Sequence, residues 1–108
     1  MSNYQAFIDA LEAGVKELAQ KTLHNFKDEA LTDAKAFLKA SQNDLQEWTG
    51  QLQNGELSKD DFEWLVQGRK DAAELYALKQ AGLAAVKMDQ FRTALINLVV
   101  NTATSTFL

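Results

Sequence analysis

The sequence predicts an all-α protein built as an antiparallel hairpin of two long helices, over about residues 3–53 and 59–101. Three observations support this fold class. Large apolar residues recur every eleven positions in the first half, the 108-residue chain contains no proline, and an Asn-Gly pair interrupts the apolar pattern near its middle. Eleven residues make three helical turns, so one helix face can stay turned toward a partner. The eleven-residue series is Tyr4, Val15, Phe26, Phe37 and Trp48.

The first predicted helix, 3–53, carries a continuous apolar row at spacings of three and four, which is the pattern of one helix face. Ser2 and Gln5 match a capping box at its start. Breaks at 28–33 and at 41–44 are the alternative, but neither segment contains Gly or Pro, so we expect the helix to continue through both. Besides the eleven-residue series, the row contains Ile8, Leu11, Ala19, Leu23, Ala30, Ala34, Ser41, Leu45 and Leu52.

The hairpin turn has the clearest local signal in the chain. Asn54 and Gly55 form a typical helix ending, because glycine accepts the left-handed backbone conformation at little cost. Ser58 is the expected N-cap of the second helix, and Asp60 and Asp61 place negative charge in its first turn, which favours a helix N-terminus. The sequence therefore predicts that the chain reverses over 54–58.

Folding at Gly55 predicts a register in which facing positions have numbers that sum to about 110 to 113. In this register Asp33 faces Lys79 and Asp44 faces Arg69, so we expect two ion pairs at the edge of the helix contact. Trp48 faces Phe62. Large residues otherwise face small ones, as an interdigitated core requires: the expected pairs are Phe37–Ala73, Ala34–Tyr76, Phe26–Ala84 and Ala19–Phe91.

The second predicted helix, 59–101, is too apolar to be covered by one partner helix. Because two-fold dimers are the commonest oligomers, we expect two hairpins to pack as a four-helix-bundle-like homo-oligomer, most simply a dimer. The alternative is a monomeric up-down four-helix bundle, with breaks near 28–33 and near Met88-Asp89. The expected oligomer interface consists of Leu75, Leu83, Val86, Ile96, Val99 and Val100.

Composition narrows the function classes. The length suits a single helical domain, 1–108, and the net charge of −4 disfavours nucleic-acid binding, which needs a basic surface. The chain has no cysteine, which excludes disulfides and fits a cytoplasmic location. No charged residue follows Arg92, but the apolar content of 93–108 is below that of a membrane-spanning helix, so we interpret this segment as packed on protein.

No catalytic, cofactor-binding or metal motif is found in the sequence. The single histidine, His24, is interpreted as a solvated pair with Asp28 on the helix surface. We therefore expect a non-enzymatic structural or protein-interaction module that self-associates through its helix faces. An amphipathic helical protein that binds a membrane surface is the first alternative, and a small enzyme or metal binder with a site between subunits is the second. Trp48, Phe62 and Trp64 cluster at the predicted hairpin tip, where they either seal the end of the bundle or form a surface for a partner.

Overall fold

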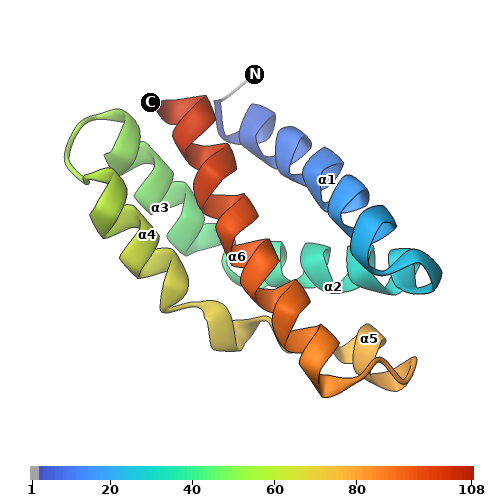
Figure 1. Ribbon diagram of the computed structural model, residues 1–108. Helices are drawn as coiled ribbons and strands as arrows, with labels where there is room; N and C mark the ends of the chain where they lie inside the picture. Colours follow the sequence, from blue (N-terminus) through green and yellow to red (C-terminus); the bar gives the residue numbers. More distant parts are fainter. Residues whose placement is uncertain (1–2) are drawn as a thin grey trace.

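The structure, a computed structural model, describes residues 3–108 and confirms the all-α class. Over these residues the chain forms α-helices and short 3-10 helices and contains no strand (Figure 1). Ser2, half of the expected capping box, lies outside the described residues. The α-helices are α1 (Asn3–Thr22), α2 (Lys27–Ala40), α3 (Gln42–Gln53), α4 (Lys59–Gln67), α5 (Tyr76–Gln80) and α6 (Ala85–Phe107); the 3-10 helices are η1 (His24–Phe26) and η2 (Lys70–Ala72).

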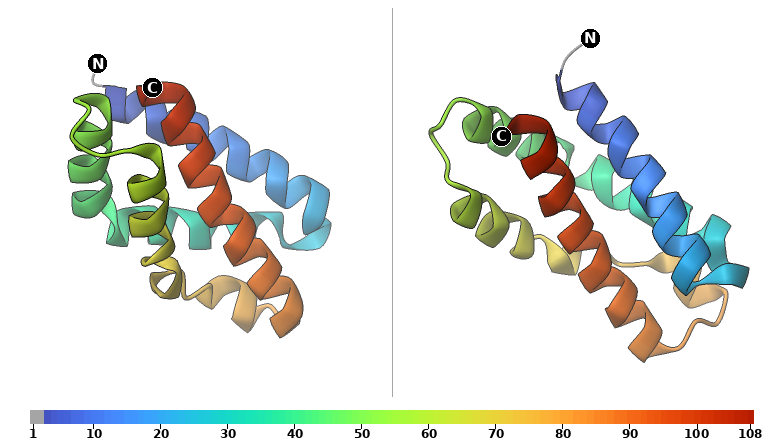
Figure 2. Two further views of the ribbon diagram at one scale, coloured as in Figure 1. Left: turned by 60° about the vertical axis from the view of Figure 1, so that its left-hand side comes forward. Right: turned by 45° about the horizontal axis from the view of Figure 1, so that its top comes forward.

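Helix α6 is the central element, and it contacts α1, α3, α4, α5 and η2. Helix α1 runs antiparallel to it, and Figure 2 shows the start of α1 and the end of α6 at the same end of this pair. The rings of Phe7 and Phe107 lie 5.7 Å apart between centroids. The two helices also approach closely at Gly14, where an added Cβ would lie 3.0 Å from Leu98 Cδ1. The longest dimension of the fold is 42 Å, far below the roughly 75 Å of an unbroken 3–53 helix.

The expected continuous helix over 3–53 is wrong, because the chain reverses after Thr22 and bends again at Ser41. Neither break contains Gly or Pro. At the first, the N–H of Leu23 still donates to Ala19, but the N–H of Phe26 donates back to Leu23 in a tighter 3-10 turn. Thr, His and Asn, which surround Leu23, are weak helix formers. The reversal lets α2 pack on α1, so that both helices bury the apolar row.

The expected helix over 59–101 is also wrong, because it is interrupted twice before α6 begins. After α4 the chain passes through η2 to Leu75, a non-glycine residue in the left-handed region with φ of 57°. The second interruption follows α5 and contains Gly82, with φ of 89°. The break that the four-helix alternative placed near Met88-Asp89 does not occur, since both residues lie inside α6.

Parts of the antiparallel register persist across these breaks, since α1 contacts α6, α2 contacts α5 and α3 contacts α4. The predicted ion pair between Asp44 and Arg69 is confirmed, with 3.7 Å between Oδ2 and Nε. The predicted partner of Asp33 is wrong: its carboxylate accepts backbone N–H groups of α5 instead of binding Lys79. Tyr76 does not fill the space opposite Ala34 either, because it is 64% exposed.

The core lies between α6 and the helices that surround it. The apolar row of the first half is buried or half-buried throughout, and the fully buried Phe7 adds to it although sequence reasoning did not include it. Helices α3 and α4 also cover α6, so a single chain covers most of the apolar surface that the hairpin would have left open. Five of the six expected oligomer-interface residues are therefore interior: Leu75, Leu83, Ile96, Val99 and Val100. The sixth, Val86, is 68% exposed.

Candidate functional site

The turn between α3 and α4 has the predicted geometry, and it places the two helices side by side. Asn54 caps the end of α3, and Gly55 follows with φ of 78°. Ser58 is the N-cap of α4, because its Oγ accepts the N–H of Asp61 at 3.1 Å. We call residues 42–67, which comprise α3, the turn and α4, the acidic hairpin.

A groove of about 460 Å³ runs between α3 and α4, and tryptophans from both helices line it. Trp64 is 75% exposed and Trp48 is half-buried. Phe62, the third residue of the predicted tip surface, is fully buried in the core and does not line this groove. We call this site the tryptophan groove; its lining residues are Asp44, Trp48, Trp64, Leu65, Gln67, Gly68 and Arg69.

Arg69 holds the end of the groove against the bend between α2 and α3. Its Nε donates to Ser41 Oγ at 3.2 Å, and its Nη2 donates to the carbonyl oxygen of Ala40 at 3.3 Å. Asp44 lies on the same guanidinium at 3.7 Å. Sequence reasoning paired Arg69 with Asp44 but missed Ser41 and Ala40, because the helix was expected to continue through them. The charge of Arg69 is thus already engaged within the chain.

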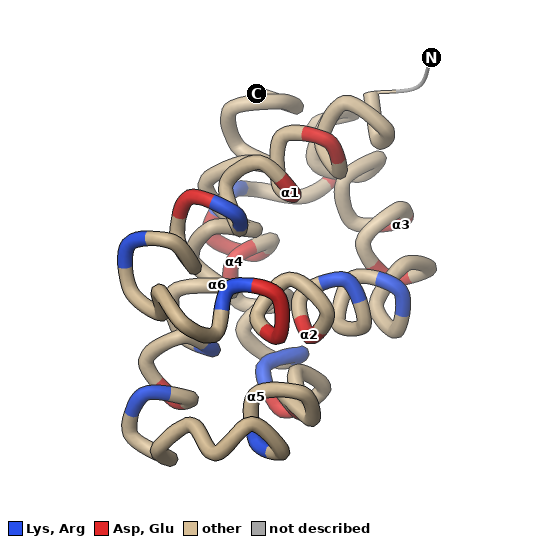
Figure 3. Tube along the Cα trace, turned by 90° about the vertical axis from the view of Figure 1, so that its right-hand side faces the viewer, with Lys and Arg blue, Asp and Glu red and all other residues tan. Residues whose placement is uncertain are grey.

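The segment that carries the groove is rich in carboxylates, while the groove lining itself contains one, Asp44, which is paired with Arg69. The acidic hairpin contains six acidic residues and one lysine, a net charge of −5, while the whole chain carries −4. The rest of the chain therefore sums to +1, and the negative charge of the protein is concentrated on α3, the turn and α4. Figure 3 shows acidic residues on both helices. The acidic residues of the hairpin are Asp44, Glu47, Glu56, Asp60, Asp61 and Glu63.

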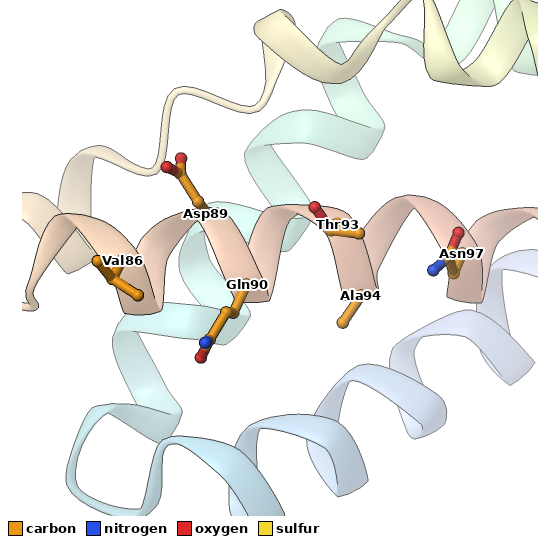
Figure 4. A pocket seen from close by; sticks show the side chains of 6 residues that line it. All are labelled: Val86, Asp89, Gln90, Thr93, Ala94 and Asn97. Carbon is orange, nitrogen blue, oxygen red and sulfur yellow. The ribbon is translucent and has the colours of Figure 1, made fainter.

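A second, open groove of about 490 Å³ lies along the outer face of α6. All of its lining residues belong to α6, and Figure 4 shows Val86 and Gln90 on one side of the helix with Asp89 on the other. It is therefore the exposed surface of one helix rather than a cleft between elements. Its lining residues are Val86, Asp89, Gln90, Thr93, Ala94 and Asn97.

Two further groups of polar residues do not form a chemical site. Asp33 borders a cavity of about 260 Å³, but both of its carboxylate oxygens accept backbone N–H groups, at 2.9 Å each. His24 is exposed on η1, outside any long helix, so the helical i,i+4 arrangement expected for His24 and Asp28 is absent. In the described part of the chain, no three His, Cys, Asp or Glu side chains gather closely enough to hold a metal ion.

Over residues 3–108, no helix combines the length and the apolar character that crossing a bilayer requires. Comparison with protein-family models, with curated proteins and with solved structures found no match to this chain. The candidate site therefore rests on its own geometry.

Proposed function

We propose that this protein is a non-enzymatic protein-interaction module that binds its partner through the tryptophan groove. The observation that carries the proposal is Trp64, 75% exposed beside Trp48 and Leu65. Tryptophan is among the residues that most often dominate binding energy at protein interfaces. A large aromatic side chain held in water next to an apolar groove is therefore suited to a binding role.

The lining of the groove supports binding rather than catalysis. It contains no histidine and no hydroxyl or thiol nucleophile. Its two charged side chains, Asp44 and Arg69, bind each other, and Arg69 also binds the end of α2. A general acid or base needs a group free to exchange a proton with a substrate, and this groove offers none that is unengaged. We also propose a cytoplasmic location, which the absence of cysteine favours.

The proposal is tested by selecting binders from a random peptide display library on the immobilised full chain, and then measuring each binder on two variants. We expect Trp64→Ala to weaken the selected peptides by about tenfold or more. Tyr76→Ala is the matched control, because Tyr76 is 64% exposed and does not line the groove. Circular dichroism establishes that both variants remain helical. Binders that ignore Trp64→Ala, or that lose as much affinity with Tyr76→Ala, contradict the proposal.

Self-association is a second candidate function, and a different surface supports it. Val86 is 68% exposed at the α6 groove, and the charged residue that lines this groove, Asp89, is paired with Arg92 at 2.6 Å, so two copies of this face meet without strong repulsion. Sedimentation velocity over a range of protein concentrations tests it. Association at micromolar concentration that Val86→Asp abolishes supports a homo-oligomer, whereas a monomer at every concentration rules it out.

A further inference from the structure

We infer that the occupant of the tryptophan groove is a basic amphipathic segment of another protein, in which an apolar anchor stands next to Lys or Arg. This inference rests on the proposed function and names the chemistry of the partner. It is carried by one juxtaposition: the exposed tryptophan surface lies on the segment that holds the negative charge of the chain.

The charge argument is local. Exposed charges in the cell act over about 8 Å before salt screens them, so a partner on α3 and α4 responds to the hairpin rather than to the chain average. The hairpin carries −5, and residues 42–70, which add Arg69 and Lys70 directly after α4, still carry −3. Arg69, at the end of the groove, is bound by Ala40, Ser41 and Asp44. An acidic partner would thus meet a segment of net negative charge whose groove-lining cation, Arg69, is already engaged.

The groove also fits both parts of such a segment. An aliphatic or aromatic anchor can pack into the 460 Å³ space beside Trp48 and Leu65. The exposed ring of Trp64 offers a face for an ammonium or guanidinium group, and tryptophan is the strongest of the aromatic side chains in cation–π contacts. Glu47 and Glu63 each lie one position from a tryptophan, outside the groove lining, and can pair with basic residues of a segment that extends past the groove.

Other occupants conflict with the same charge. A second copy docked on this face would bring two hairpins of −5 together. An anionic bilayer attracts basic segments and repels acidic ones, so the exposed tryptophan has no electrostatic help toward a membrane surface. Nucleic acid is excluded on the same ground, because its phosphates need cations. A basic peptide segment is the remaining class whose charge complements the hairpin.

The direct test uses three amphipathic peptides of about 15 residues with identical apolar positions and with Lys, Gln or Glu on the polar face. Affinity for the full chain is measured by fluorescence anisotropy of a dye on the peptide. We expect the Lys peptide to bind about tenfold or more tightly than the Glu peptide, with the Gln peptide between them. Raising the salt concentration from about 0.05 M to about 0.5 M weakens the Lys peptide most.

Variants assign the effect to the hairpin. Glu47→Gln with Glu63→Gln is expected to weaken the Lys peptide by about threefold to tenfold. The matched control, Glu17→Gln with Glu74→Gln, removes the same charge from exposed positions outside the hairpin and leaves the affinity unchanged. Trp64→Ala lowers the affinity for the Lys peptide by about tenfold. Equal losses in both charge variants would mean that only net charge matters, which overturns the inference.

The outcomes separate this inference from the proposed function. If peptides selected from the display library depend on Trp64 but are neutral or acidic, the inference fails and the interaction module stands. If neither the Lys peptide nor any selected peptide depends on Trp64, the proposed function fails as well. Self-association that Trp64→Ala abolishes, or flotation with phosphatidylserine vesicles that depends on Trp64, overturns the basic segment in favour of a second copy or a membrane surface.

Discussion

The carboxylate of Asp33 on α2 accepts the backbone N–H of Leu78 on α5 at 2.9 Å, and that of Ala77 at the same distance. Helix α5 has five residues. Its N-cap residue, Leu75, has an apolar side chain that cannot accept hydrogen bonds from the first N–H groups of the helix. Helices this short are not stable in isolation. A carboxylate from a distant helix therefore serves as the cap, and it fastens the segment between α4 and α6 onto α2.

Replacement of Asp33 by alanine is predicted to lower the free energy of unfolding by about 2 kcal/mol, because one buried and one partly buried N–H group lose their acceptor. Urea denaturation measures the loss, and hydrogen exchange at Ala77 and Leu78 should rise more than exchange in α1. Asp71→Ala is the control, since Asp71 is exposed on η2. Equal destabilisation by the two variants would contradict the capping role.

Arg69→Ala is predicted to destabilise the fold by about 1.5 kcal/mol, since it removes hydrogen bonds to Ser41 and Ala40 where α2 ends. Arg69→Lys should recover only part of this loss, because an ammonium lacks the planar fork that reaches both acceptors. Lys79→Ala serves as the control: Lys79 is exposed, and the expected pair with Asp33 does not form. Thermal unfolding tests the expected order, in which Arg69→Ala is the least stable variant, Arg69→Lys is intermediate and Lys79→Ala is the most stable.

These two contacts explain what the sequence could and could not predict. The turn at Gly55 and the Asp44–Arg69 pair depend on local signals and on pairing about one fold point, and both were predicted. The bend at Ser41 was not, because the arginine that stabilises it lies 28 positions away. Helix α5 likewise depends on Asp33. Contacts between residues this far apart in the sequence cannot be recognised locally, because the apolar row continues across the break.

The same reasoning applies to the candidate site. The sequence predicts Trp48 and Trp64 as part of one surface, and both line the groove. The same prediction includes Phe62, which is fully buried. Residues two apart on a helix point in different directions, so Phe62 and Trp64 could not share one face. Which of them enters the core depends on where α6 lies, and the position of α6 follows from the interruptions of the expected second helix.

Two glycines near the turn should respond oppositely to alanine. Gly50→Ala is predicted to stabilise the fold by about 0.8 kcal/mol, because Gly50 lies inside α3 and its added Cβ meets no atom within 4 Å. Gly55→Ala should destabilise it by about 1 kcal/mol, because its φ of 78° strains a residue with a side chain. Chemical denaturation of both variants measures the two signs, and a shared sign would contradict the backbone argument.

From the buried hydroxyl of Tyr4 we predict that the fold loses stability at alkaline pH. Its hydroxyl is buried without a hydrogen-bond partner among the described residues, and burial raises the pKa of the phenol above its usual value. The folded chain thus holds the proton more tightly than the unfolded chain. The contribution of Tyr4 to the free energy of unfolding should be constant below pH about 10 and should fall as the pH rises above it.

Tyr4→Phe removes both the unpartnered hydroxyl and this titration. We expect it to stabilise the fold by about 1 kcal/mol at neutral pH and to reduce the alkaline loss. Tyr76→Phe, at an exposed tyrosine, should change neither quantity. Urea denaturation at pH values from neutral to strongly alkaline compares the three proteins. An unchanged alkaline slope in Tyr4→Phe would contradict the assignment.

The same substitution at two valines of α6 separates the interior of the chain from its surface. Val99 is fully buried, so Val99→Asp places a charge in the core and is predicted to remove about 4 kcal/mol of stability or to prevent folding. Val86 is 68% exposed, so Val86→Asp should change stability by less than about 0.5 kcal/mol. Denaturation and sedimentation are measured on both variants. If both stay folded and both lose self-association, Val99 is an intermolecular contact and the packing of α6 within one chain is wrong. If Val99→Asp unfolds while Val86→Asp stays folded, the apolar side chains of the second half are buried within one chain. Any homo-oligomer must then use the outer face of α6.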